Sequence, residues 1–246
     1  MENTSFIILS IIIAFFAYFV KGLAGFGPSL IIIPVFSLFI DIKQAIIIAA
    51  LADLLSSGVL IGGSYKHINW KIFKRVGIGL LVGTLLGVSI FRSLDSSMIK
   101  RMFGILLLSY IVIPLFLSKL STQINRLKGW FGGLISGFVG GICGGMFNTN
   151  GPPLLIYIST VLSSKESIRS TMLGLLFVDS LWRITLFVSK GFITSDVLQF
   201  FGFVIVPALL LGVYASFQVD KIMKNQHYLY LTRSLLFVLG MNLILS

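Results

Sequence analysis

Charged side chains are scarce in this sequence of 246 residues, since only 11% of the residues are Asp, Glu, Lys or Arg. Water-soluble domains carry about 25% charged residues because their surface has to be solvated. Here 57% of the residues are hydrophobic, and the mean hydropathy is +1.03. The missing charge excludes an ordinary soluble surface and predicts a multi-pass integral protein of the plasma (inner) membrane.

Cysteine and histidine are also rare. Cys143 is the single cysteine, which excludes an intrachain disulfide and a cysteine-cluster metal site. The histidines, His67 and His227, are too few to complete a metal site without further ligands. No Walker A motif occurs, so ATP-driven work by this chain alone is not expected. The sequence therefore predicts no metal and no cofactor.

The net charge of +11 has a simple explanation in a membrane protein. Its basic residues lie between apolar runs, whereas nucleic-acid binders gather them on one soluble face or along one helix. We therefore expect no nucleic-acid partner. The placement fits the rule that loops on the cytoplasmic side are basic, and it favours contact with anionic membrane lipid.

The hydrophobic residues form ten runs, and these predict an all-α transmembrane helical bundle. The runs lie at about 6–20, 28–40, 44–64, 76–91, 102–117, 130–142, 152–163, 170–189, 197–217 and 230–245. A membrane crossing needs roughly 20 residues of helix. The runs 6–20 and 28–40 are each short for a crossing, and so are 130–142 and 152–163. Each of these two pairs is predicted to form a hairpin.

Glycine and proline interrupt both hairpins. The first break is Lys21-Gly22-Leu23-Ala24-Gly25-Phe26-Gly27-Pro28, and the second extends from Gly140 to Pro153. Glycine relaxes the backbone and proline lacks a hydrogen-bond donor, so a continuous helix is not expected at either place.

The two breaks belong to an internal repeat with an offset near 125 residues. Pro28 corresponds to Pro152, and Asp53 and Asp179 follow these prolines by 25 and 27 residues. Further on, Leu86-Gly87-Val88 corresponds to Leu211-Gly212-Val213. The predicted domains are a first repeat, 1–122, and a second repeat, 123–246.

We expect the repeats to be inverted, because a returning hairpin followed by three crossings places the second half in the opposite orientation. Twelve cations then lie on one side of the membrane and five on the other, which assigns the basic side to the cytoplasm. The alternative counts one limb of each hairpin as a full crossing, which gives eight spans and two halves of equal orientation.

The breaks are the candidate binding site. Irregular backbone within a membrane is tolerated only where it is buried in protein or lines a cavity, and paired breaks in two halves mark the substrate site of many transporters. Helices that start near Pro28 and Pro152 would direct the positive ends of their dipoles toward an anion. The alternative is that the glycines only allow close helix packing. The predicted substrate-binding residues are Lys21, Gly25, Gly27, Pro28, Ser29, Asn148, Thr149, Asn150, Gly151, Pro152 and Arg183.

Two acidic residues accompany the breaks. Asp53 and Asp179 occupy equivalent places in the halves and are candidate proton carriers, because carboxyl groups in membrane segments commonly form proton relays. Arg183 lies four residues after Asp179, so the two share a helix face, and Arg183 can bind an anion, pair with Asp179, or do both. Structural polar contacts are the alternative role for both acids. An intramembrane aspartyl protease is less favoured, because Leu51-Ala52 and Phe177-Val178 stand where its signature has glycines.

These motifs resemble those of the TauE/SafE family of sulfite and organosulfonate transporters. The resemblance rests on Gly22–Pro28 followed by an apolar run to Pro34, on Gly137–Gly141 leading to Gly151-Pro152-Pro153, and on Lys165 and Ile168–Thr171. It spans nearly the whole chain. Many family members have a denser glycine run at the first break, where this chain has Gly25-Phe26-Gly27. The resemblance implies a small sulfur-containing anion as the substrate.

The leading hypothesis is therefore a secondary transporter with no enzymatic activity. It would move a small anion by alternating access, with one inverted half rocking against the other. An uncoupled anion channel is the alternative, and an intramembrane enzyme that uses Asp53 and Asp179 is a less favoured one. The coupling ion, proton or sodium, and a homodimeric state both stay open.

Overall fold

The structure is a computed structural model and describes residues 4–62, 65–117 and 129–219. Within these ranges it is helical and contains no strand, which confirms the all-α prediction. The elements in chain order are α1 Thr4–Ala24, α2 Ser29–Phe36, α3 Ile42–Ile61, η1 Tyr65–His67, α4 Trp70–Ser93, α5 Ser96–Leu117, α7 Trp130–Phe147, α8 Gly151–Val161, α9 Lys165–Ser189, α10 Ser195–Phe200, the π-helical turn η3 Phe201–Ile205, and α11 Val206–Val219.

Six helices of the described residues are long and apolar enough to span a membrane. They are α1, α3, α4, α7, α9 and the continuous helix formed by α10, η3 and α11. The protein is therefore a multi-pass integral membrane protein, as predicted. The apolar run 230–245 and the boundary between residues 122 and 123 lie outside the described residues.

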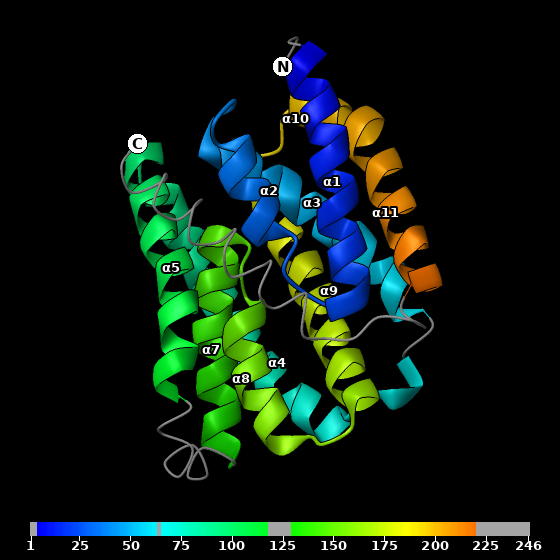
Figure 1. The fold of residues 1–246 in the computed structure, drawn as a ribbon. Coiled ribbons are helices and arrows are strands. Elements are labelled where there is room, and N and C mark those ends of the chain that lie inside the picture. The colour runs from blue at the N-terminus through cyan, green and yellow to red at the C-terminus, as the bar shows by residue number, and fades with distance from the viewer. Residues whose placement is uncertain (1–3, 63–64, 118–128, 220–246) are drawn as a thin grey trace.

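The two interrupted helix pairs enter the bundle from opposite ends. In Figure 1, α1 descends from the N-terminal end into the bundle and α2 turns back upward, whereas α7 rises from the other end and α8 turns back downward. The first limbs are longer than the apolar runs predicted, because α1 has 21 residues and α7 has 18. By length alone both could cross a membrane. The return limbs are short, with 8 residues in α2 and 11 in α8.

The second break is much shorter than the sequence indicated. Residues 140–145 are helical and belong to α7, and the chain leaves the helix only at Asn148 to Asn150. The expected break from Gly140 to Pro153 was therefore wrong over its first half. Tertiary packing outweighs the low helix propensity of glycine here.

Glycines bring α4 and α7 into direct backbone contact. A Cβ atom added at Gly83 would lie 3.0 Å from the Cα of Gly141, and one added at Gly87 would lie 3.0 Å from the Cα of Gly145. Gly137 likewise faces the α4 backbone at Val76 and Leu80. A second close pair joins α1 to α11, where Gly212 meets the backbone of Phe15 and Phe19. Packing of small residues is thus one role of these glycines.

Candidate functional site

Residues with a left-handed backbone conformation allow the chain to turn at each of the two breaks. Gly25 and Gly27 have φ angles of 83° and 101°, which only glycine adopts readily. The second turn uses Asn148, with φ of 56°, and asparagine is one of the few other residues that tolerate this region. The N–H of Gly25 donates to the carbonyl oxygen of Lys21 at 2.7 Å, and that of Asn148 donates to Gly144 at 2.8 Å. Each turn therefore provides a hydrogen bond to one of the backbone carbonyl oxygens that lack a partner at the end of a helix.

The two breaks meet at one buried pocket. Nine of the predicted substrate-binding residues line it: Lys21, Gly27, Pro28, Ser29, Asn148, Thr149, Asn150, Gly151 and Pro152. Gly25 and Arg183 do not line it, although Arg183 lies in the polar network behind it. Of the two acids, Asp53 lines the pocket and Asp179 does not. Only about 20 Å³ is free for the centre of a water-sized group, which is little more than one water molecule needs.

The helices that start at this pocket lack side-chain caps. Asp41, Asn69, Ser164 and Thr194 cap α3, α4, α9 and α10 by accepting hydrogen bonds from backbone N–H groups. By contrast, α2 begins after Pro28 and α8 after Asn150 without such a bond. The N–H groups of Gly27, Ser29 and Asn150 make no backbone hydrogen bond within the described residues. These donors and the positive dipole ends favour an anion.

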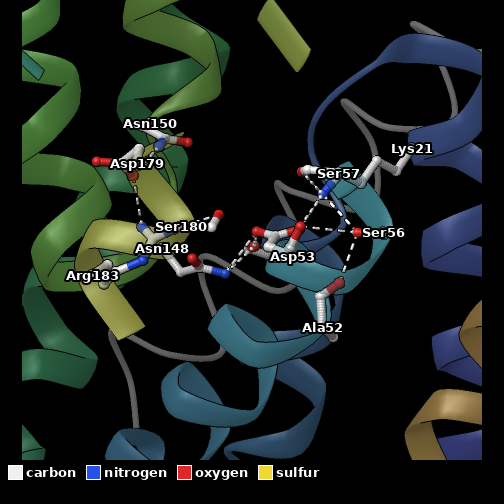
Figure 2. A network of polar contacts seen from close by, with 11 residues as sticks. Lys21, Ala52, Asp53, Ser56, Ser57, Asn148, Asn150, Asp179, Ser180 and Arg183 are labelled. Atoms are coloured by element: carbon white, nitrogen blue, oxygen red, sulfur yellow. Dashed lines mark hydrogen bonds and ion pairs between the residues drawn. The ribbon is translucent and has the colours of Figure 1, made fainter. Parts of the chain in front are cut away.

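Lys21 and Asp53 form a buried ion pair beside the pocket. The Nζ of Lys21 lies 2.7 Å from Oδ1 of Asp53, and the two residues are 1% and 9% exposed. Lys21 also donates to the hydroxyl oxygens of Ser56 and Ser57 at 2.8 and 2.9 Å. The other carboxylate oxygen of Asp53 accepts from the Asn148 amide at 2.8 Å (Figure 2). The ion pair thus joins the first hairpin to α3 and to the second break.

A second buried ion pair lies on α9. Arg183 Nη1 is 3.3 Å from Oδ2 of Asp179, and the two residues are 1% and 0% exposed. The Asn150 amide donates to the same oxygen at 2.6 Å, and the Thr84 hydroxyl donates to Oδ1. Arg183 also donates to the carbonyl of Gly144 at 2.7 Å. The pairing of Asp179 with Arg183 that their spacing allowed is present, and it holds Arg183 away from the pocket.

Several contributing residues, among them the pocket-lining Leu30 and Leu176, were missed by the sequence interpretation. Ser56 and Ser57 follow Asp53 by three and four positions, so helical spacing could have placed them beside it. Phe26, within the first break, lines the pocket. Thr84 lies in the middle of an apolar run on α4 and carries no local signal for its bond to Asp179.

Comparison with known proteins identifies the family. The family described as "Sulfite exporter TauE/SafE" matches residues 10–243. The chain belongs to the TauE/SafE family. This is a family of membrane transporters, so the resemblance is confirmed, and the intramembrane enzyme is not supported.

Two curated proteins are similar to this TauE/SafE chain at low sequence identity. One is named a probable sulfite/organosulfonate exporter, from Cupriavidus necator, and is 27% identical over 172 residues, which cover 68% of this chain and 66% of the relative. The match thus spans just under two thirds of that relative's length. The other is named a probable membrane transporter protein, from Methanocaldococcus jannaschii, with 22% identity over 96% of this chain and 95% of the relative. No solved structure matches this chain.

Proposed function

We propose that this protein is a secondary transporter that binds a small sulfur-containing anion, such as sulfite or a sulfonate, in the pocket between the two breaks. The observation that carries the proposal is the meeting of two uncapped helix N-termini, α2 and α8, at one buried pocket with Lys21. Backbone N–H groups near Gly27, Ser29, Asn150 and Gly151 bind the oxygens of the anion, and Lys21 supplies positive charge. The choice of a sulfur-containing anion follows the family and the name of the Cupriavidus relative.

Alternating access is the mechanism that fits this geometry. A sulfite ion has four heavy atoms, so it enters the pocket only after the walls move apart. An open pore would need a continuous aqueous path, and a pocket with room for about one water molecule favours a carrier.

The inverted relation that the sequence predicts for the two repeats is part of this proposal, and the packing of the helices is compatible with it. Under the predicted repeat, α1 corresponds to α7 and α4 corresponds to α11. The close pair of α1 and α11 therefore corresponds, under the predicted repeat, to the close pair of α7 and α4. Labelling of cysteines placed at Lys66 and Lys190, in a Cys143→Ser background, tests the inversion: the two positions react from opposite sides, and reaction from one side would contradict it.

Transport by purified protein in vesicles tests the function. Labelled sulfite and alkanesulfonates are expected to enter protein-containing vesicles faster than empty ones. Unlabelled substrate inside should accelerate labelled uptake, because a carrier exchanges its ligands and an open channel does not. Uptake without this acceleration would favour the channel. Uptake no faster than in empty vesicles, for every small anion tried, would remove the proposal.

A further inference from the structure

The charges at the centre of the molecule already cancel one another. Lys21, Asp53, Asp179 and Arg183 are all buried there, and their formal charges sum to zero (Figure 2). A monovalent anion that enters the pocket would add one negative charge that nothing in this group neutralises. Burying an unpaired charge is strongly unfavourable, so binding requires a compensating change in the group.

Lys21 has no donor to spare for the anion in this arrangement. An ammonium group has three N–H donors, and here they face Asp53 Oδ1, Ser56 Oγ and Ser57 Oγ at 2.7, 2.8 and 2.9 Å. The two serines are neutral and leave the positive charge of Lys21 uncompensated. The Asp53 carboxylate neutralises that charge and therefore competes with an anion for Lys21. The anion therefore binds Lys21 when Asp53 no longer holds it.

We propose that Asp53 takes up a proton when the anion binds, so that Lys21 is released to the anion and one proton travels with each monovalent anion. The inference rests on the proposed function and names its coupling ion. The proton comes from water on the side to which the pocket is open and forms an O–H bond on the carboxylate. It leaves on the other side, where Asp53 pairs with Lys21 again after the anion departs.

The neighbours of Asp53 suit both states of its carboxyl group. Ser29 Oγ and Asn148 Nδ2 donate to Oδ2 at 3.0 and 2.8 Å. A hydroxyl can accept as well as donate, and an amide can turn over to present its oxygen. The Oδ1 of Asn148 is buried and has no hydrogen-bond partner within the described residues. It is thus available to accept the new O–H of Asp53 after such a turn.

Asp179 is not equivalent to Asp53, despite its matching position in the repeat. It is 0% exposed and does not line the pocket, while Asp53 does. Its partner Arg183 keeps its bonds to the Gly144 carbonyl and to Ser180, at 2.7 and 3.2 Å. Arginine also does not lose its proton in proteins. The Asp179–Arg183 pair is therefore a fixed element of the site.

Few ionisable groups besides Lys21 face Asp53. Tyr18 lies on the same helix as Lys21, with its ring centre 5.9 Å from the Lys21 Nζ, and Asp179 and Arg183 come from α9. In the described residues, α2 and the turn 148–150 contribute only neutral groups to Asp53. Asp53 is the acid among these groups that contacts both the pocket and Lys21.

Calorimetric binding to the purified full chain tests the proposal. The probe is methanesulfonate, which stays ionised across the working pH range, with sulfite run beside it. Titrations in buffers of different ionisation enthalpy count the protons taken up per anion. The wild type is expected to take up about one proton, and its affinity should fall about tenfold per pH unit where Asp53 is ionised. Asp53→Asn should bind without proton uptake and without this pH dependence. Asp196→Asn is the control, because Asp196 is exposed and lies outside both the pocket and the buried charge group, and this variant should keep both.

The outcomes separate the coupling from the function itself. Anion binding by the wild type without proton uptake would overturn the coupling and leave the transporter intact. This result decides the matter even if Asp53→Asn fails to fold. Loss of proton uptake in both variants alike would overturn the assignment to Asp53. Failure of the wild type to bind either anion would count against the proposed function.

Discussion

Replacing Gly83 by alanine tests the backbone contact between α4 and α7. The added Cβ would lie 3.0 Å from both Gly141 Cα and Ile142 N, and closer to the Phe138 carbonyl oxygen. Non-bonded heavy atoms prefer about 3.5–4.0 Å, and the Phe138 oxygen is the nearest obstacle, so the helices must separate by roughly 1 Å or more. Overpacking lowers the free energy of unfolding by about 3 kcal/mol at the upper end of its usual range. We apply this upper value because the added atom meets backbone atoms, which cannot move aside as a side chain can. Alanine is about 1 kcal/mol more favourable than glycine in a helix, so the net decrease in the free energy of unfolding is about 2 kcal/mol.

Gly77→Ala on the same helix is the matched control for Gly83→Ala. A Cβ at Gly77 would meet only Leu175 Cδ2, at an ordinary 3.6 Å, so this variant should gain up to about 1 kcal/mol. The assay is thermal unfolding of both purified variants in the same detergent. At roughly 2–4 °C per kcal/mol, Gly83→Ala should melt about 6–12 °C below Gly77→Ala. Equal melting temperatures would refute the close contact of the two helices.

Two further predictions concern the polar network. Lys21→Met leaves the Asp53 carboxylate buried without its cation and should lower stability by about 3–5 kcal/mol in thermal unfolding. Adding Asp53→Asn should recover much of this loss, and no recovery would mean that the charge pair is not the cause. Asn148→Gly keeps the left-handed turn and removes the amide, so it should lower anion transport with little change in melting temperature. Asn148→Ala adds backbone strain of about 1 kcal/mol or more and should also melt lower; equal melting of the two variants would contradict the strain.

Sequence patterns located the helices and the breaks, because both depend on local composition. Gly25, Gly27 and Pro28 interrupt the helix wherever the rest of the chain lies, and the turn lies where these residues indicated. The pairing of Arg183 with Asp179 could also be anticipated, since i and i+4 positions face each other on any helix.

Contacts between distant segments were beyond sequence reasoning. Nothing local pairs Lys21 on α1 with Asp53 on α3, or brings Thr84 on α4 to Asp179 on α9. The same limit explains the error at Gly140–Gly145. Glycine looks like a helix breaker in isolation, yet here it is the residue that allows α7 to lie against α4.

The glycine contacts also determine which parts of the molecule can move as one body. α4 belongs to the first predicted repeat and α7 to the second, and the same is true of α1 and α11. A motion that separated the two halves would have to pull apart backbones that touch at Gly83 and Gly141, and at Phe15 and Gly212. In the proposed transport cycle, each rigid unit would therefore combine helices from both predicted halves. The predicted sequence repeats and the moving parts of the proposed cycle would then not coincide.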